Sequence, residues 1–557
     1  MKHRLMLAFL VAVVTSVLVL GPPVAADDAS QVDAIFAKWT ATTPGCAVGV
    51  AVDGKPALTK AYGMADLEHD VRNTPETIFE GGSVSKQFTA AAVLLLAREG
   101  KLSLDDPVKK YVPELPDYGT PLLIRHMLNH TSGLRDWGSV AGIAGWARTT
   151  RVYTHAHVLE IVSRQHALNF PPGTRWSYSN TGFNLAAIIV SRVSGMPFAD
   201  FTRTRIFEPL HMTHTSWRDD HTRVVKDRAI AYDDKLDGFH TDMPFEQVYG
   251  NGGLLTTVGD LLTWNENFVT PVVGDASFVA AQQQVGKFSD GRAHDYALGL
   301  YNRTYKGVRQ VDHSGSTAGY RADLARYPDQ HLSVAVLCNV SSAIATQAGR
   351  AVADVYLGGR AKAVAPPTPT FTLAAADVDR MSGLYRNTAT GVPLTISPGA
   401  DGPRVERGPS DGLNPNAGIK LIAMSSSRFE TAQHQTYEFD ARGVRTTDAF
   451  GRVDTYDRPP AVKPAAEDLR DLAGSYVSDE AETTLTAAID GGALVIRRRP
   501  DTTLALTPIY ADAFTAPQLG LVIFRRTGGR VTGLSVVQDR VWDLRFARQA
   551  APVKSSQ

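Results

Sequence analysis

One short segment of the chain pairs a serine with a lysine at helical spacing. "GGSVSK" places Ser83 three residues before Lys86, ahead of an almost unbroken apolar run. Side chains at positions i and i+3 lie on the same face of a helix, and burial favours the neutral form of a lysine amine. A neutral Lys86 can take the hydroxyl proton of Ser83, which makes the serine a nucleophile.

The same spacing has a structural alternative, in which Ser83 caps a helix and the lysine ammonium reaches solvent. Chance also yields roughly one S-x-x-K match in a chain of this length. The choice between the two interpretations therefore depends on companion residues elsewhere in the sequence.

The first companion segment is "WSYSNTGF", a turn-rich loop directly before an apolar helix pattern. A tyrosine hydroxyl near a lysine ammonium is stabilised as phenolate, which suits Tyr178 to general-base work. The amide of Asn180 can hydrogen-bond a substrate carbonyl. The Y-x-N tripeptide recurs at Tyr385, so it indicates chemistry only together with the other segments.

The second companion segment is "VDHSGSTAGY", where a strand is expected to begin after a polar loop. Gly315 permits close backbone approach. The N–H of Ser316 can then join the N–H of Ser83 in an oxyanion hole. The imidazole of His313 is placed to hydrogen-bond the tyrosine or the leaving group.

The order S-x-x-K, Y-x-N and H-x-G resembles the serine β-lactamase-like superfamily. The nearest groups are class C β-lactamases, D-alanyl-D-alanine carboxypeptidases, D-aminopeptidases and family VIII esterases. Connecting segments such as "IRHMLNHTSGL" and "GNGGLLTTVGDLLTW" strengthen the resemblance, which covers residues 31–357. It implies acyl transfer through an acyl-serine, without a metal or cofactor. The implied roles are nucleophile for Ser83, proton partner for Lys86, proton shuttle for Tyr178, substrate binding for Asn180, and the third motif for His313, Gly315 and Ser316.

One residue departs from the class C β-lactamase pattern. Those enzymes carry a lysine in place of His313, and its fixed charge binds the substrate carboxylate, whereas imidazole is largely neutral at pH 7. We therefore expect a serine hydrolase acting on small peptide, amide or ester substrates, including D-amino-acid peptides, and β-lactamase activity is disfavoured.

Several alternatives stay open. The sequence does not separate peptidase from carboxylesterase, nor does it assign the first proton transfer to Lys86 or to Tyr178, which can titrate as a coupled pair. A catalytically silent binding or sensor protein is the rival from another class. The full set of companions around Ser83 argues against that rival.

The composition and the first residues predict where the protein acts. The 57 Lys and Arg residues balance 57 Asp and Glu residues, so we expect no nucleic-acid partner. A basic start, an apolar run and small residues before Asp27 predict a signal peptide over residues 1–26 and a periplasmic or secreted protein. No later stretch predicts a retained membrane span. The oligomeric state stays open.

The chain has two cysteines, Cys46 and Cys338, both in apolar strand-like runs. A bridge between them is compatible with an oxidising compartment. Two separate buried thiols are the favoured interpretation.

Residues 27–360 mix strand and helix patterns, with strands at both ends. This pattern predicts an α+β domain in which an antiparallel sheet pairs the two ends of the segment and is flanked by helices and a helical lobe. A linker at 361–372 leads to two similar units, recognised by the repeat of "DVDRMSGLYRN" in "DLRDLAGSYVS". Each unit predicts an antiparallel, lipocalin-like β-barrel. The barrels span 373–460 and 467–548, with a linker at 461–466 and a tail at 549–557.

This layout resembles that of the three-domain D-aminopeptidases, in which a loop of the last barrel reaches the active site and selects a free substrate amine. The candidate loop here is "RRRPDTTLALTPIYADAFTAP", with Asp501 or Asp512 as the amine partner. A surface turn is the favoured role for either aspartate. A weaker inference is that the barrels only cap or bind.

Three other groups of residues are set aside. His126 and His130 have the spacing of a zinc site but lack the glutamate of H-E-x-x-H. His155 and His157 lack a third ligand and have a surface pattern. The triplet at residues 497–499 indicates a solvated strand edge rather than an anion site. We therefore expect no metal.

Overall fold

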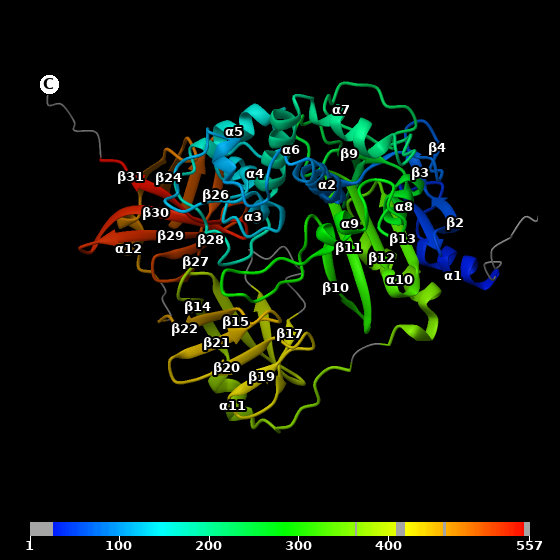
Figure 1. Ribbon diagram of the computed structural model, residues 1–557. Coiled ribbons are helices and arrows are strands. Elements are labelled where there is room, and N and C mark those ends of the chain that lie inside the picture. The colour runs from blue at the N-terminus through cyan, green and yellow to red at the C-terminus, as the bar shows by residue number, and fades with distance from the viewer. Residues whose placement is uncertain (1–25, 363–364, 408–417, 461–463, 551–557) are drawn as a thin grey trace, which may run out of the picture.

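The computed structural model describes residues 26–362, 365–407, 418–460 and 464–550 (Figure 1). The predicted signal peptide lies outside the described residues except for Ala26. Three units follow one another along the chain: a mixed α/β unit, a first barrel and a second barrel.

The first unit is built on a six-stranded antiparallel sheet with the order β10-β11-β12-β13-β1-β2. β1 and β2 are joined by Asp53 and Gly54, which both adopt the positive φ that a tight hairpin turn requires. β1 also pairs with β13 along its whole length. The prediction that the sheet joins the two ends of this unit is thus confirmed. The strands are β1 (Cys46–Val52), β2 (Lys55–Tyr62), β10 (Tyr301–Tyr305), β11 (Val308–Thr317), β12 (Tyr320–Tyr327) and β13 (Leu332–Cys338).

Cys46 and Cys338 form a disulfide, so the expectation of two separate thiols is wrong. The antiparallel register places Cys46 directly opposite Cys338, with their Cα atoms 4.0 Å apart. The bond therefore ties the first strand of the unit to its last strand.

Alternation along the strands creates two different faces of this sheet. On β13, Val334 and Val336 pack with α1 and α10, whereas Ala335 and Leu337 pack toward α2 and α8. The helices of the first unit are α1 (Ala26–Phe36), α2 (Ser85–Arg98), α3 (Ile124–Leu128), α4 (Trp137–Ile143), α5 (His155–Ser163), α6 (Asn180–Ser194), α7 (Phe198–Thr202), α8 (Val258–Glu266), α9 (Ala276–Gln283) and α10 (Ala345–Leu357).

The helical lobe between β2 and β10 centres on α2, which is buried along almost its whole length and packs against α6. Short strands in this region form three small sheets of their own, β3-β4, β5-β9-β6 and β7-β8. They are β3 (Met64–Asp66), β4 (Val71–Arg72), β5 (Phe79–Glu80), β6 (Ser216–Trp217), β7 (Tyr232–Lys235), β8 (Gly238–Thr241) and β9 (Leu254–Thr256).

The first barrel is a nine-segment antiparallel sheet with the order β17-β16-β15-β14-β22-β21-β20-β19-β18. The two outer segments are separated in the chain only by Leu421, so the ring nearly closes and counts eight strands when they are taken as one. Its elements are α11 (Ala375–Met381), β14 (Gly383–Asn387), β15 (Pro393–Gly399), β16 (Gly402–Arg407), β17 (Ile419–Lys420), β18 (Ile422–Ala423), β19 (Arg428–Glu430), β20 (Thr436–Phe439), β21 (Gly443–Thr447) and β22 (Val453–Asp457).

The second barrel repeats this topology, with the order β26-β25-β24-β23-β31-β30-β29-β28-β27. The repeat extends to single hydrogen bonds: the Tyr385 hydroxyl donates to the Met381 carbonyl, and the Tyr476 hydroxyl donates to the Leu472 carbonyl. Its elements are α12 (Ala466–Asp471), β23 (Gly474–Ser478), β24 (Thr483–Asp490), β25 (Ala493–Arg498), β26 (Thr502–Ala505), β27 (Thr507–Tyr510), β28 (Ala513–Ala516), β29 (Gly520–Thr527), β30 (Arg530–Gln538) and β31 (Val541–Arg548).

The second barrel lies against the helical lobe of the first unit (Figure 1). Arg498 donates to the carbonyls of Gly142 and Ile143, and Arg499 donates to that of Ala144, at the end of α4. A cation at a helix C-terminus satisfies its free carbonyls and dipole. Arg498 is buried. The expectation of a solvated edge at residues 497–499 is therefore wrong for this residue.

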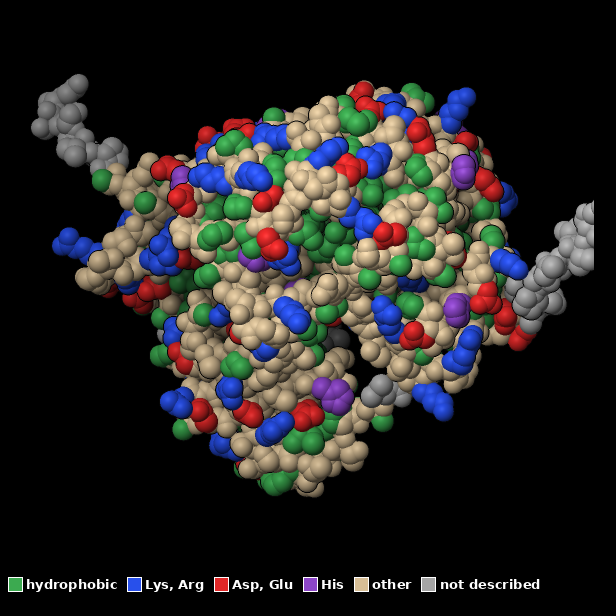
Figure 2. Space-filling model, in the orientation of Figure 1, with side chains coloured by type: hydrophobic (Ala, Val, Ile, Leu, Met, Phe, Trp, Pro, Cys, Tyr) green, Lys and Arg blue, Asp and Glu red, His purple; other side chains and the backbone are tan. Residues whose placement is uncertain are grey.

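The molecular surface on the side of Figure 2 mixes basic and acidic side chains without a large area of one sign. Within the described part of the chain, no single helix has the length and apolarity to cross a membrane, although the bent pair 180–194 and 198–207 meets the test jointly.

Removing the disulfide should destabilise the first unit. It closes a loop of 292 residues, and such a bond stabilises a fold mainly by restricting the unfolded chain, by about 2–4 kcal/mol. We expect the double variant Cys46→Ala/Cys338→Ala to melt at a lower temperature than the oxidised protein by calorimetry. Dithiothreitol should lower the wild-type midpoint to that of the variant and leave the variant unchanged. Equal midpoints for variant and oxidised wild type would contradict the role assigned to the bond.

Candidate active site

Ser83 lies in a single 3-10 turn, Gly82–Val84, directly before α2. Gly82 has a φ of +50°, and a Cβ atom there would lie 2.6 Å from the backbone nitrogen of Ser316. Only glycine fits, because β11 passes against this turn. The close approach places the nucleophile candidate beside the third motif.

Lys86, on the first turn of α2, has a fully buried side chain. Its Nζ lies 3.1 Å from Ser83 Oγ, 2.9 Å from Asn180 Oδ1 and 2.7 Å from the Asn251 carbonyl oxygen. A neutral amine has two N–H groups and one lone pair. The two oxygens from Asn180 and Asn251 accept the N–H groups, so the lone pair is left for the Ser83 hydroxyl proton.

Burial lowers the pKa of Lys86 well below its usual value, because the charged ammonium loses its hydration. The guanidinium groups of Arg540 and Arg148 lower it further, and the carboxylate of Asp136 opposes them. The shift favours the neutral amine, which is the state that a proton acceptor needs.

The Tyr178 hydroxyl is hydrogen-bonded to Ser83, while Lys86 Nζ lies 4.8 Å from the centre of the tyrosine ring. Burial raises the pKa of Tyr178 to about 12, although the Ser83 bond and the Arg540 charge act in the opposite direction. The expectation of a partial phenolate is therefore wrong, because burial outweighs the interactions that would stabilise one. Tyr178 is a neutral phenol that can pass a proton on.

Gly315 brings β11 against the nucleophile turn. A Cβ atom at Gly315 would lie 2.0 Å from the Gly81 carbonyl oxygen and 3.1 Å from the Ser83 nitrogen. Ser316 is the next residue in the strand. The backbone N–H groups of Ser83 and Ser316 therefore lie on two closely packed segments, the nucleophile turn and β11. This is the placement that an oxyanion hole requires.

His313 is fixed by two hydrogen bonds. Its Nδ1 lies 2.6 Å from the Ser314 carbonyl oxygen and its Nε2 lies 2.9 Å from the Tyr296 hydroxyl. A carbonyl only accepts, so Nδ1 carries the proton and Nε2 accepts from Tyr296. Burial, with the nearby Lys86, lowers the pKa of His313 to about 3. The ring is therefore neutral, and the tyrosine that it contacts by hydrogen bond is Tyr296 rather than Tyr178.

Asp136 joins the site from the segment before α4. Its Oδ2 accepts from the Asn180 backbone N–H at 2.8 Å, and its Oδ1 accepts from the Ser139 N–H at 3.1 Å. The buried carboxylate thus orients the asparagine that contacts Lys86. The sequence offered one signal for it, an aspartate three residues before Ser139 at a helix start.

The second barrel contributes the turn between β30 and β31. Asp539 and Arg540 at this turn line the same cavity as Ser83, and the Arg540 Cζ lies 4.7 Å from the centre of the Tyr178 ring. The Arg540 carbonyl accepts from the Asp136 N–H at 3.2 Å and from Asn169 Nδ2 at 3.1 Å. These bonds fix the turn at the cavity.

The loop of the last barrel that reaches the cavity is therefore not the predicted one. Asp512 is paired with Arg526 on the barrel surface at 2.9 Å. Asp501 lies in an exposed turn. Neither aspartate lines the cavity of Ser83, so the turn at Asp539 and Arg540 replaces them as the candidate.

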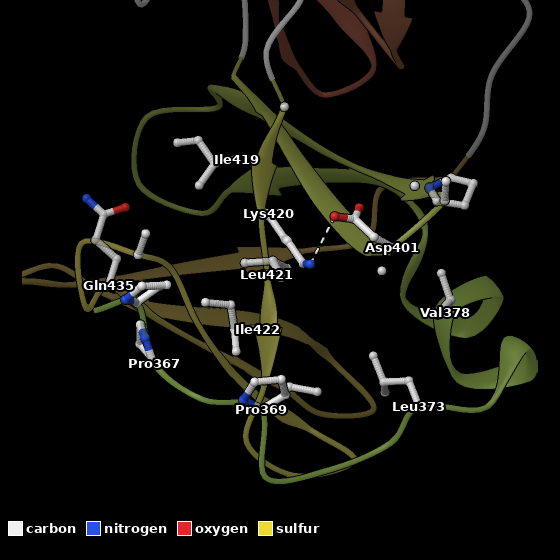
Figure 3. A pocket seen from close by; sticks show the side chains of 18 of the residues that line it. Pro367, Pro369, Leu373, Val378, Asp401, Ile419, Lys420, Leu421, Ile422 and Gln435 are labelled. Carbon is white, nitrogen blue, oxygen red and sulfur yellow. Dashed lines mark ion pairs between the residues drawn. The ribbon is translucent and has the colours of Figure 1, made fainter. Parts of the chain in front are cut away.

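All seven predicted site residues line or contact one cavity of about 770 Å³. A larger cavity of about 1600 Å³ lies between the first barrel and the preceding linker (Figure 3). It is lined by Pro367, Pro369 and Lys420, whose Nζ lies 2.9 Å from Asp401. No predicted site residue lines it. The smaller cavity is therefore the candidate active site.

The histidines that were set aside have structural roles. His130 packs on the Tyr178 ring, with ring centres 4.2 Å apart, and its Nδ1 accepts from the Ser179 N–H at 3.2 Å. His155 Nε2 bonds the Tyr249 backbone. His157 Nδ1 accepts from the Thr154 N–H at the start of α5. The last two are half-buried rather than on the surface.

The charge of Arg540 should be visible in the pH dependence of activity. A neighbouring positive charge lowers the pKa of Lys86, and catalysis needs the neutral amine. Arg540→Gln should therefore raise that pKa and move the acid limb of the kcat/KM profile to higher pH. Arg530→Gln, at the far end of β30, is the matched control and should leave the limb in place. A limb that stays in place in both variants would contradict the electrostatic role of Arg540.

Comparison with known proteins agrees with this geometry. The Beta-lactamase family model matches residues 32–357. A D-aminopeptidase of Gluconobacter oxydans is 28% identical over 531 residues, covering 91% of this chain and 96% of the relative. A D-aminopeptidase of Brucella anthropi is 27% identical over 510 residues, covering 88% and 93%.

Among solved structures, the octameric penicillin-binding protein homologue from Pyrococcus abyssi superposes with a TM-score of 0.54 at 22% identity. The match covers 86% of this chain and 99% of that chain. At this identity the likeness concerns the fold. Together with the family match over more than half of the sequence, these findings show that the chain belongs to the Beta-lactamase family and is a serine hydrolase.

Proposed function

We propose that the protein is a D-aminopeptidase-type hydrolase, which releases an amino-terminal D-amino acid from small peptides or amides. The observation that carries this proposal is the contact of a buried, neutral Lys86 with Ser83, at 3.1 Å. It is supported by the two D-aminopeptidases, which align with both barrels as well as the first unit.

The first step is formation of an acyl-serine. Lys86 takes the proton of the Ser83 hydroxyl, and Oγ attacks the substrate carbonyl carbon. The N–H groups of Ser83 and Ser316 stabilise the resulting oxyanion. The C–N bond then breaks as Tyr178 donates its proton to the leaving nitrogen, and the proton held by Lys86 restores the phenol.

Hydrolysis of the acyl-serine reverses these roles. A water molecule loses its proton to the same Lys86 and Tyr178 pair and attacks the ester carbon. Ser83 leaves and regains a proton. Asn180 serves both steps, because its Oδ1 holds the Lys86 amine while its amide nitrogen is available to a substrate carbonyl.

The neutral His313 bears on the choice of reaction. It supplies no fixed charge at the third motif. β-Lactamase chemistry is therefore disfavoured despite the family description. A substrate amine has one carboxylate partner among the cavity-lining residues, Asp539 on the second-barrel turn. This residue supports recognition of a free amino terminus.

We also propose that the protein is exported to the periplasm or beyond the cell. The basic and apolar pattern of the first residues supports this proposal. The Cys46–Cys338 disulfide is also compatible with an oxidising compartment.

The proposed reaction is tested by hydrolysis of D-alanine p-nitroanilide against its L-enantiomer. We expect turnover of the D-form, a strong preference over the L-form, and loss of about 10³-fold or more in Ser83→Ala, since the covalent step is removed. A fluorophosphonate probe should label the wild type and not Ser83→Ala. Absence of both turnover and labelling would instead support a binding protein.

A further inference from the structure

We propose that Arg540 and Arg148 form an anion subsite in the active-site cavity, which binds a carboxylate carried by the substrate. This inference rests on the proposed hydrolase function and narrows its substrate class. The preferred substrates would be D-amino-acid peptides or amides that bear a negative charge.

Arg540 is held in the cavity by its backbone, while its guanidinium remains accessible. The side chain is 38% exposed, and its nearest carboxylate among the described residues is that of Asp539, at 4.0 Å. Asp539 is itself 64% exposed, so this ion pair contributes little. The guanidinium lies over the Tyr178 ring, next to the reacting atoms.

Arg148 enters the same cavity from the helical lobe. Its Nε donates to Glu246 Oε2 at 2.8 Å, and one terminal nitrogen contacts Glu246 Oε1. The guanidinium also packs 5.4 Å from the centre of the Trp137 ring. Its other terminal nitrogen has no hydrogen bond within the described part of the chain. Arg148 is thus fixed in direction and still has a donor to offer.

The buried charges behind the cavity leave a positive excess. Arg218 binds Glu80 through two bonds of 2.8 and 3.1 Å and lies 3.8 Å from Glu246. Arg228 lies 3.7 Å from Glu80. Three arginines, Arg148 included, therefore share two glutamates.

Charges of both signs face the cavity, and what distinguishes it is the guanidinium donors that the protein leaves open. Arg540 and Arg321 also line the cavity. Asp539 pairs with Arg540 only across 4.0 Å at an exposed position, and Arg321 donates to the Ala318 and Tyr320 carbonyls. The Asp136 carboxylate is occupied by two backbone N–H groups. Lys86 and His313 are both neutral. A substrate carboxylate would accept hydrogen bonds from the guanidinium donors of Arg540 and from the remaining terminal nitrogen of Arg148.

The chemistry of guanidinium groups favours a carboxylate in this position. A guanidinium presents planar, paired donors that match the two oxygens of a carboxylate. Arg540 and Arg148 both act on Lys86 and Tyr178, so each lies close to the reaction centre. An anion between them would screen their mutual repulsion and position the scissile carbonyl.

Paired substrates test the subsite. For a carboxylate on the acyl side, D-glutamyl p-nitroanilide is compared with D-glutaminyl p-nitroanilide. For a carboxylate on the leaving group, D-alanyl-D-alanine is compared with D-alanyl-D-alaninamide. We expect kcat/KM to favour the charged member of one pair by at least about tenfold, the range of a charge-assisted hydrogen bond. The pair that shows the preference locates the carboxylate.

Arg540→Gln should bring that ratio to near one, and Arg530→Gln should leave it unchanged. A ratio within a pair is insensitive to the altered basicity of Lys86, because both substrates use the same base. The Arg540 side chain is partly exposed and makes no hydrogen bond within the described part of the chain. This variant should therefore fold. Arg148→Gln removes the closer of the two arginines that contact Glu246. The thermal midpoint of this variant is therefore measured as well.

Binding of glutarate to Ser83→Ala by calorimetry gives a readout without turnover, with glutaramide as the neutral control. We expect glutarate binding that Arg540→Gln abolishes. Turnover of D-substrates with ratios near one, and no glutarate binding, would overturn the subsite and leave the proposed function intact. A preference that survives in Arg540→Gln would overturn the assignment of this residue. Arg540-dependent glutarate binding without turnover of any D-substrate would support the subsite and overturn the proposed function.

Discussion

The burial of Lys86 is the constraint on which the rest of the site depends. An ammonium without water or a counter-ion costs several kcal/mol, and the protein avoids this cost by holding the amine neutral. Neutrality requires two acceptors for its N–H groups, which the Asn180 side chain and the Asn251 carbonyl supply. The lone pair is then available to the proton of the Ser83 hydroxyl, 3.1 Å away. One desolvated amine thus fixes both the geometry and the chemistry.

The second barrel belongs to this arrangement rather than merely covering it. The Arg540 carbonyl bonds the Asp136 N–H, and the Asp136 carboxylate bonds the Asn180 N–H. Asn180 in turn holds Lys86. The barrel also brings the Arg540 charge, which acts against Asp136 on the lysine. Two domains therefore set the basicity of one amine through opposite charges, and the position of the barrel matters for the reaction.

The sequence predicted the residues whose spacing is local and missed those whose role arises from packing. Ser83 and Lys86 share a helical turn, and Gly315 and Ser316 are adjacent, so a pattern reveals them. Tyr296 and Arg540 look like a core aromatic and a surface turn until the fold places the first against His313 and the second over Tyr178. The Cys46–Cys338 bond depends on a register between strands 292 residues apart. The antiparallel pairing of the two ends of the first unit was predictable, but its alignment residue by residue was not.

His313 carries no charge at the third motif, and the positive charges of the cavity lie on other residues, among them Arg148 and Arg540. A lysine at the third motif would place a fixed cation on β11, but the Tyr296 hydroxyl and the Ser314 carbonyl occupy both imidazole nitrogens. Two of the cations that line this cavity, Arg148 and Arg540, come instead from the helical lobe and the second barrel, and a third, Arg321, lies on β12. An anionic group bound by Arg540 lies beside the Tyr178 ring. A substrate that carries this charge must then bind with its anionic group toward Arg540. The second barrel therefore has a direct influence on substrate choice.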